Sequence, residues 1–259
     1  MTESTELKEA QAGNQEIELV RESKVRLVRA FSHDIKNPLG AADGFAQLML
    51  DGLMGDLSDK QQDAVTRIRA SIATALSIIN NVVEFARAEA GQIEIRPSPF
   101  ATDSLVREVV AEHGAAAEAA GVTLATGPLD GGRITSDAVR IHQILGHLVS
   151  NAIRYGGAGG EGVAPGAGGT VTVSATLETG DLSRVLFTVT DEGQGIPEDE
   201  QHLLFQEFQR LQGGRKEGTG LGLAISRHIA RALSGDVIVD SATGRGSTFT
   251  LRIPAVPAA

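Results

Sequence analysis

The sequence lacks cysteine and tryptophan, and aromatic residues make up only 3% of its 259 residues. Without cysteine there is no disulfide bond, no thiolate nucleophile and no cysteine-bound zinc or iron–sulfur centre. The scarcity of aromatic rings argues against a base-stacking surface for single-stranded nucleic acid. The formal net charge of -10 repels a phosphate backbone, so we expect no nucleic-acid partner.

Long apolar runs are also missing. None approaches the roughly 18 residues that a membrane-spanning helix needs. The first residues, MTESTELKEAQAGNQE, are polar and acidic and lack the basic and apolar blocks of a signal peptide. We therefore expect a cytoplasmic protein with no membrane segment in this chain. Apolar residues make up 41% of the sequence, enough for one large or two modest domains.

The first part of the sequence has the pattern of two helices. Two sets of apolar residues follow heptad spacing. These sets are Val28, Phe31, Ile35, Ala42, Phe45 and Met49, and then Val65, Ile68, Ile72, Ala75, Ile79, Val82 and Ala86. Between them, DGLMGDLSD contains two glycines and a candidate N-cap at Ser58, and Gly91 is a candidate helix end. The pattern predicts an antiparallel helical hairpin over residues 25–95.

These apolar stripes are too wide for two helices to bury against each other, because Leu76 and Val83 broaden the second one. Pairing with a second copy would give a four-helix bundle, so we expect a homodimer. The alternative is a hairpin that packs on the second half of its own chain. Residues 1–24 continue in a helical register that does not match the heptads. They are either the end of a signalling linker or a frayed arm.

The stretch RPSPF, from Arg96 to Phe100, marks a junction and a candidate hinge. Residues 96–259 mix helical and strand patterns. The helical stretches are SLVREVVAEH, DAVRIHQILGHLVSNAIRY and TGLGLAISRHIARALSG, and the strand-like ones are GVTLAT, TVTVSATLE, RVLFTVTD, GDVIVD and STFTLRI. Asp137 is a candidate N-cap. We expect an all-α hairpin followed by an α+β sandwich with a mostly antiparallel sheet and helices on one face.

A glycine-rich stretch covers residues 156–169 and reads GGAGGEGVAPGAGG. It has no Lys followed by Ser or Thr, so it is not a P-loop. We expect a flexible loop and assign it no function.

Three motifs in the second half point to one nucleotide site. The first is Asn151, with Arg154 and Tyr155 one turn further along a helix. The second is DEGQGI, residues 191–196, directly after a strand, and the third is GTGLGLAI, residues 218–225, at a helix entry. Each motif is weak alone, but the ordered set, with FQEF at residues 205–208 between the last two, is specific.

The residue types suit a nucleotide. A buried carboxylate at Asp191 can accept a hydrogen bond from an exocyclic amine such as that of adenine. Gly193 and Gly195 allow the backbone to approach a flat base. Glycines at the helix entry free backbone N–H groups for phosphate, and the amide oxygen of Asn151 with phosphate oxygens would satisfy magnesium. Positive side chains that could neutralise phosphate flank the glycine loop. They are Arg210, Arg215 and Lys216.

In this order, the motifs resemble the N, G1, F and G2 boxes of the sensor histidine kinases, whose ATP-binding fold is shared with gyrase, Hsp90 and MutL. FSHDIKNPLG, residues 31–40, resembles their H box. The resemblance covers about Val25 to Pro254 and implies that His33 accepts the γ-phosphoryl group of ATP and passes it to an aspartate of a response regulator receiver domain. It implies Mg²⁺ as a cofactor and Asn151 as a metal ligand. The ATP-binding residues that it implies are Asn151, Arg154, Tyr155, Asp191, Gly193, Gly195, Arg210, Gly218, Thr219, Gly220, Leu221 and Gly222.

Within the H-box stretch, the heptad register places His33 on the outward face of its helix. Neutral imidazole is the nucleophilic form of histidine. Asp34 can accept the Nδ1 proton and leave the Nε2 lone pair free, and the resemblance supports this general-base role. The resemblance also implies that Asn37, one turn away, positions a water that dephosphorylates the regulator. Pro38 cannot donate to the carbonyl of Asp34, so we expect a bend there rather than a helix end.

The sequence departs from the family pattern at a few positions. Arg154 stands where Lys is more frequent, and Glu217 replaces a frequent glycine. His147 stands where many members have Asn, and it could assist the metal, pack or form a second-shell hydrogen bond. ATP-hydrolysing relatives of the gyrase type have a catalytic Glu at that position, so His147 argues against efficient hydrolysis. The non-enzyme alternative, a pseudokinase that only docks partners, would be expected to have a broken box, and none is broken.

Overall fold

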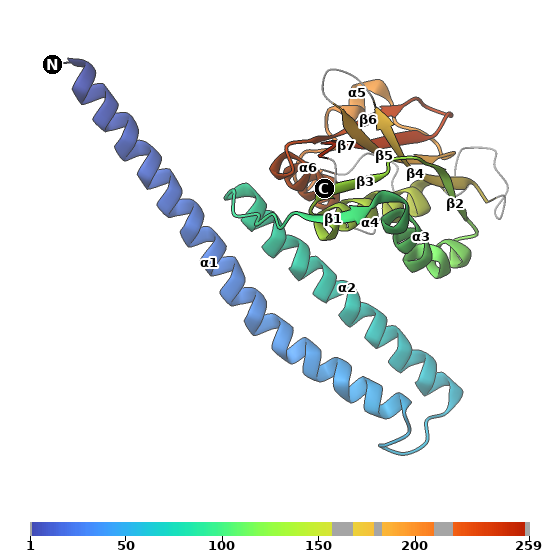
Figure 1. Ribbon diagram of the computed structural model, residues 1–259. Coiled ribbons are helices and arrows are strands. Elements are labelled where there is room, and N and C mark those ends of the chain that lie inside the picture. The colour runs from blue at the N-terminus through green and yellow to red at the C-terminus, as the bar shows by residue number, and fades with distance from the viewer. Residues whose placement is uncertain (1, 157–167, 179–182, 210–219, 257–259) are drawn as a thin grey trace. The chain divides into compact units, whose positions relative to one another are not determined.

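The computed structural model describes residues 2–156, 168–178, 183–209 and 220–256, with side chains from residue 23 onward. The chain divides into two compact units, Met1–Gln92 and Ile93–Ala259 (Figure 1). Among the described residues, no helix is both long and apolar enough to cross a membrane. Arg210, Gly218 and Thr219, three of the predicted ATP-binding residues, lie outside the described parts of the chain.

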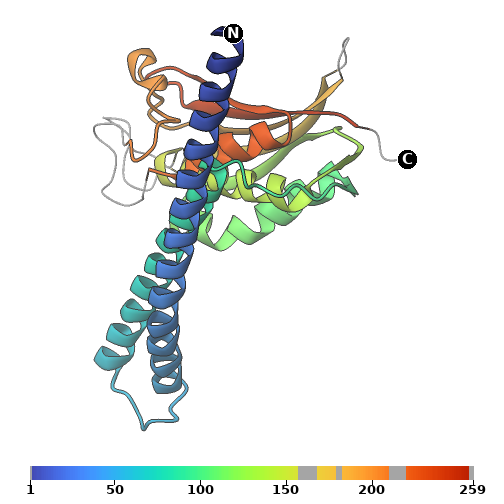
Figure 2. The same cartoon turned by 90° about the vertical axis from the view of Figure 1, so that its left-hand side faces the viewer.

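The first unit is the predicted helical hairpin. Helix α1 spans Thr2–Leu50 and continues through Pro38, and α2 spans Asp59–Glu89 (Figures 1 and 2). Ser58 is the N-cap of α2, and its backbone N–H donates to Oε1 of Gln61 at 2.9 Å. Gly91 follows the end of α2 with φ of 67°, the left-handed conformation expected of a residue that ends a helix. The predicted start and end of the second helix are therefore confirmed.

Two different faces of α1 carry its apolar residues. The apolar Val25 and Ala46 are buried and share the face toward α2 with the buried polar residue Ser32. The heptad stripe lies roughly a quarter-turn away, because successive helical residues are about 100° apart. On this stripe Phe31 and Phe45 remain 60% and 61% exposed. The hairpin therefore buries one face of α1 and leaves a second apolar face on its surface.

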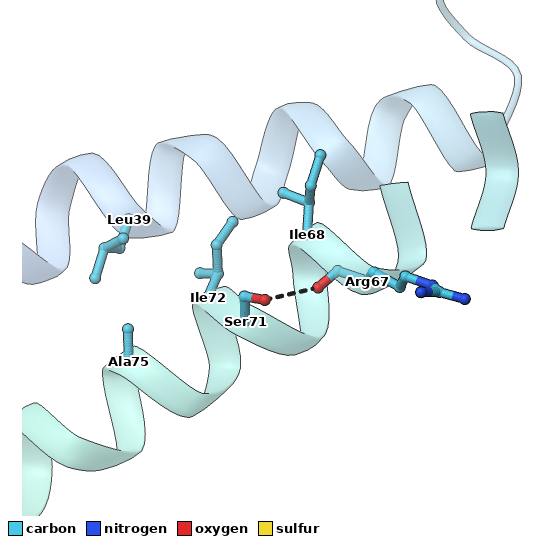
Figure 3. A pocket seen from close by; sticks show the side chains of 6 residues that line it. All are labelled: Leu39, Arg67, Ile68, Ser71, Ile72 and Ala75. Atoms are coloured by element: carbon cyan, nitrogen blue, oxygen red, sulfur yellow. Dashed lines mark hydrogen bonds between the residues drawn. The ribbon is translucent and has the colours of Figure 1, made fainter. Parts of the chain in front are cut away.

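A hollow of about 360 Å³ opens between the two helices of the hairpin (Figure 3). Leu39 lines it from α1, and Ile68, Ile72 and Ala75 line it from α2. Ile68 is 53% exposed, so the walls of the hollow are apolar and accessible. The apolar surface of the hairpin thus includes both helices.

Ion pairs join the two helices of the hairpin near its middle and at its end. Arg69 Nε lies 2.8 Å from Asp43 Oδ1, and Lys24 Nζ lies 2.6 Å from Glu89 Oε2. The guanidinium of Arg69 hydrogen-bonds Asp43 and lowers the pKa of that carboxyl. These side chains are partly exposed, so they contribute more to the alignment of the helices than to stability.

The second unit contains the mixed elements predicted for it. Its helices are α3 (Thr102–Ala119), α4 (Ala138–Gly156), α5 (Glu198–Gln201) and α6 (Gly222–Ala232), and its strands are β1 (Ser98–Ala101), β2 (Thr123–Leu129), β3 (Arg133–Ser136), β4 (Thr170–Glu178), β5 (Arg184–Asp191), β6 (Asp236–Ser241) and β7 (Ser247–Pro254). Five strands form a sheet in the order β2-β4-β5-β7-β6, with β2 parallel to β4 and the other pairs antiparallel. The short strands β1 and β3 form a separate antiparallel pair that the sequence pattern did not reveal.

Helices α3, α4 and α6 cover one face of the five-stranded sheet (Figure 2). Alternate residues of β5 point into this layer, and Val185, Phe187 and Val189 are fully buried. Helix α4 has more buried residues than α3 or α6, and Asp137 caps its start by accepting from the backbone N–H of Arg140 at 3.1 Å. The predicted α+β fold, with its helices on one face of the sheet, is therefore confirmed.

Candidate functional site

His33 is presented to solvent on α1. Its side chain is 75% exposed, and that of Asp34 is 79% exposed. The preceding residue, Ser32, is buried on the face toward α2, and its hydroxyl donates to the carbonyl of Val28 at 2.7 Å. His33 therefore lies on neither apolar face of the helix, and its side chain is accessible to a reactant.

Two polar side chains approach the same nitrogen of His33. Its Nδ1 lies 3.6 Å from Asp34 Oδ1 and 3.4 Å from Asn37 Nδ2. A separation of 3.6 Å is too long for a hydrogen bond, so Asp34 needs a small side-chain rotation to accept the Nδ1 proton. The amide of Asn37 can donate only to an Nδ1 that carries no proton. Asp34 and Asn37 thus favour opposite tautomers of the ring.

In the second unit, Asn151 is half-buried on α4, one turn before Arg154 and Tyr155. The helix is strongly amphipathic, which fixes its rotation on the sheet. Its fully buried residues include Ile141, Ile144, Leu145, Leu148 and Val149. The 39% exposure of Tyr155 shows that the polar end of α4 reaches the surface. Asn151 and Arg154 are therefore half-buried at the edge of the core, and Tyr155 is exposed at the last turn of α4.

Asp191 is a buried carboxylate at the last position of β5, with only 6% of its surface exposed. Its Oδ1 accepts a hydrogen bond from the backbone N–H of Gly193 at 2.9 Å. Burial raises the pKa of this carboxyl, and the backbone N–H groups of Gly193 and Ser247 oppose that rise. A buried acid with a raised pKa in a polar motif is a typical feature of a functional site.

The end of α4 packs directly against Asp191. A Cβ added to Gly156 would lie only 2.5 Å from the Cβ of Asp191, so only glycine fits there. A Cβ on Gly193 would likewise lie 2.5 Å from the carbonyl oxygen of Tyr155. The first and second sequence motifs are therefore neighbours in space. Sequence analysis assigned Gly156 to the glycine-rich insert and missed this contact, which joins positions far apart along the chain.

The fold also requires glycine at position 195. Its φ is 68°, and an added Cβ would collide with the carbonyl oxygen of Ala242 in the turn between β6 and β7. The sequence interpretation gave Gly193 and Gly195 the role of approaching a base. The contacts give each glycine a packing role within the protein as well.

The third motif begins helix α6. Gly220 has a φ of 71°, Leu221 is the fully buried N-cap residue, and Gly222 is the first residue of the helix. The imidazole of His147 on α4 lies next to Gly222, because a Cβ there would be 3.8 Å from its Cγ. The glycine entry of α6 and the motif on α4 are therefore adjacent.

Phe205 of the FQEF stretch is held by a charged side chain that sequence analysis did not single out. The guanidinium carbon of Arg227 on α6 lies 4.8 Å from the centre of the Phe205 ring. Arg227 also binds Asp236 through two hydrogen bonds of 2.9 and 3.0 Å. These two interactions of Arg227 join residues from three separate segments of the chain. A pattern within one segment could not reveal them.

The other histidines form no metal site. Across the described residues, no group of three or more His, Asp or Glu side chains is arranged to hold a metal ion. His142 pairs with Glu112 at 3.2 Å, and His113 Nδ1 lies 2.9 Å from the carbonyl oxygen of Val109.

The comparisons with known proteins agree with this arrangement. Residues 23–91 match the His Kinase A (phospho-acceptor) domain, and residues 136–257 match the histidine kinase-, DNA gyrase B-, and HSP90-like ATPase domain. The chain is 33% identical over 251 residues to an uncharacterized sensor-like histidine kinase of Rhizobium meliloti, covering 95% of this chain and 46% of that protein. It is 30% identical over 246 residues to the aerobic respiration control sensor protein ArcB of Escherichia coli, covering 92% of this chain and 30% of that protein.

Among solved structures, full-length ShkA in complex with AMPPNP superposes with a TM-score of 0.75 at 30% identity, covering 91% of this chain and 47% of that one. The chain thus spans less than half the length of each of these three proteins. The two domain matches occur in the order of the two units, and together they show that this chain belongs to the sensor histidine kinases. It is a protein histidine kinase core with a phosphoacceptor hairpin followed by an ATPase-like domain.

Proposed function

We propose that the chain transfers the γ-phosphoryl group of ATP to His33 and then to an aspartate of a response regulator receiver domain. The observation that carries this proposal is the 75% exposure of a histidine on the phosphoacceptor hairpin of a chain that also has an ATPase-like domain. In the transfer to histidine, the Nε2 lone pair attacks the γ-phosphorus. The bond to the bridging oxygen breaks, and ADP leaves with its electron pair. Asp34 accepts the Nδ1 proton.

For the nucleotide, we assign the adenine to Asp191 and the phosphates to the entry of α6. The contacts of Gly156 with Asp191 and of His147 with Gly222 support one continuous site. Gly193, Gly195, Arg154 and Tyr155 belong to its walls in this proposal. So do Gly220, Leu221 and Gly222, together with Arg210, Gly218 and Thr219 outside the described residues. Catalysis would be mainly positioning and charge neutralisation, as in other phosphoryl transfers.

Magnesium fits the residues that are present. Asn151 offers a half-buried amide oxygen, and magnesium is commonly held by few protein ligands together with substrate phosphates. The ion would neutralise charge on the transferring phosphates. Asn151 would hold it, and the surrounding helix would fix the direction of the amide.

The phosphoacceptor role is tested by replacing His33 with Gln. We expect His33→Gln to incorporate no label from γ-labelled ATP, because the nucleophilic nitrogen is gone, while nucleotide binding by the second unit is unchanged. His202→Gln, which alters another exposed histidine, is the matched control and should label like the wild type. Labelling that survives in His33→Gln would contradict the assignment.

A phosphatase activity toward the regulator is the second part of the proposal. Asn37 lies one turn from His33 on the same exposed face, with Nδ2 3.4 Å from its Nδ1, so its amide can also orient a water. We expect Asn37→Ala to retain self-labelling and to lose most dephosphorylation of a phosphorylated receiver domain, measured by the loss of phosphate over time. Asp34→Asn should label itself slowly, because the acceptor for the Nδ1 proton is gone, and it should retain dephosphorylation of the receiver domain. If both variants lose both activities equally, the division of roles is wrong.

We also propose that the hairpin forms a four-helix bundle in a homodimer. The exposed stripe on α1 and the apolar hollow beside Leu39 are apolar surfaces that a second copy of the hairpin would bury. In this proposal residues 1–24 are a linker or the end of a signalling helix, residues 25–95 are the dimerisation and phosphotransfer domain, and residues 96–259 are the catalytic domain.

A further inference from the structure

The imidazole of His147 bridges two helices that carry the predicted nucleotide motifs. Its Nδ1 lies 3.1 Å from the hydroxyl oxygen of Ser226 on α6. Ser226 is fully buried, and a buried hydroxyl requires a hydrogen-bond partner. The neighbouring ring carbon, Cγ, lies 3.8 Å from the position of a Cβ on Gly222. The ring therefore packs on the bare backbone of the first residue of α6.

The position of His147 along α4 gives this bridge a consequence. Asn151 follows it by four residues, so both side chains lie on the same side of α4, one turn apart. Gly222 and Ser226 are likewise one turn apart on α6. His147 thus contacts the first two turns of α6 and fixes the distance between Asn151 and the backbone N–H groups at the helix entry. In the function proposed above, the entry of α6 binds the phosphates, and Asn151 would hold the magnesium ion that neutralises their charge.

We infer that His147 is a positioning residue for the phosphates of the nucleotide, acting through its hydrogen bond to Ser226. This inference rests on the proposed function and selects one of the roles that the sequence left open for His147. The rest of the nucleotide does not depend on the bridge, because Asp191 is held by Gly193 and by the end of α4. Loss of the bridge should therefore lower the affinity for ligands that carry a triphosphate and leave the affinity for adenosine unchanged.

The test compares two ligands by calorimetry on the full chain: AMPPNP with magnesium, and adenosine. We expect His147→Leu to weaken AMPPNP binding about tenfold, the effect typical of losing a side chain that orients a ligand-binding group, with adenosine binding unchanged. Ser226→Ala should act in the same direction. The double variant should be no worse than His147→Leu, because both substitutions remove one shared interaction.

A variant that restores the hydrogen bond distinguishes a positioning role of His147 from a role in packing alone. Asn has a polar atom at the δ position that matches Nδ1 of His147, so His147→Asn should restore most of the AMPPNP affinity, whereas the apolar Leu should not. Equal losses for AMPPNP and adenosine would overturn the inference and indicate a general packing defect. So would additive losses in the double variant, or unchanged AMPPNP binding in both single variants. If His147→Leu fails to fold, Ser226→Ala and His147→Asn still decide the question.

The same experiment distinguishes this inference from the proposed function. A wild-type chain that binds neither AMPPNP nor adenosine would contradict the proposed function itself. A wild-type chain that binds both ligands, with variants that bind equally well, would contradict only the role of His147.

Discussion

The two units of this chain differ in where their apolar side chains lie. In the second unit, strands and helices bury residues such as Phe187, Ile225 and Leu251 completely. In the hairpin, Phe31 and Phe45 are 60% and 61% exposed, and Leu27 is 59% exposed. The second unit therefore buries its large apolar side chains within its own fold, whereas the hairpin leaves an apolar stripe exposed. The difference is consistent with the proposal that the hairpin, rather than the second unit, associates with a second copy.

The largest effect is expected from a charge on the exposed stripe of the hairpin. Phe45→Glu would place a carboxylate in the proposed apolar interface between copies, where it would have no partner. We expect a dimer to become a monomer in sedimentation or light scattering, and the hairpin to lose its cooperative unfolding transition. The transition of the second unit should not change, because its core shares no residue with this stripe.

A matched control for that variant lies on another face of the same helix. Arg26 is exposed and is seven residues from His33, so it lies on the face that carries the histidine. Arg26→Glu should leave the dimer intact. A Phe45→Glu chain that remains a dimer would show that the exposed stripe is not the interface, and the contrast between the two units would lose its explanation.

Sequence periodicity was sufficient for elements whose signals are local. The loop between the helices, the caps at Ser58 and Asp137 and the helix end at Gly91 depend on neighbouring residues, and each was predicted. The pair of strands β1 and β3 was missed because each has only four residues and its partner is distant in the sequence. The heptad rule identified the apolar stripe but could not tell which apolar face of α1 meets α2.

The predicted site shows the same division. The residue types of His33, Asn151 and Asp191 made them candidates for the predicted site, because their chemistry is recognisable in short motifs. The residues that support them are ordinary in type and become significant only through long-range contacts. Gly156 touches Asp191, Ser226 binds His147, and Arg227 holds Phe205. No pattern within any one segment contains these contacts.

A smaller effect, confined to the second unit, is expected at Asp191. Asp191→Asn should weaken adenine binding, because the amide presents one acceptor oxygen in place of two, and calorimetry with adenosine measures this. The stability of the ligand-free unit should not fall. The pKa of Asp191 is raised by burial, so its ionised form costs stability once the pH rises through that pKa, and asparagine removes the charge. Asn also retains an oxygen for the N–H of Gly193.

The pH dependence of that comparison follows from the sign of the shift. Because the folded pKa is above the unfolded one, the stabilising effect of the protonated acid is present at low pH and is lost as the pH rises through the folded value. Wild type and Asp191→Asn should therefore differ least in acid and most at neutral pH, where the variant is at least as stable. A variant that unfolds at lower denaturant than the wild type at neutral pH would indicate a structural role for the carboxylate.

The smallest effect is expected at Asp236, whose pKa is lowered mainly by its hydrogen bonds from Arg227. A lowered folded pKa means that the pair stabilises the unit above the unfolded pKa and loses this contribution as the pH falls through the folded value. Because the Asp236 side chain is 37% exposed, Asp236→Asn should cost no more than about 1 kcal/mol at pH 7. The difference from the wild type in denaturant unfolding should vanish in acid.

Glu94 provides the matched control for Asp236, since Arg96 lowers its pKa through the same kind of hydrogen bond. The Glu94 and Arg96 side chains are 70% and 78% exposed, so water screens their attraction and Glu94→Gln should leave stability unchanged. Arg227 additionally lies over the Phe205 ring, and loss of Asp236 frees the guanidinium to move away from it. Equal effects of Asp236→Asn and Glu94→Gln would mean that the ion pair of Arg227 and Asp236 adds nothing to the stability of the second unit.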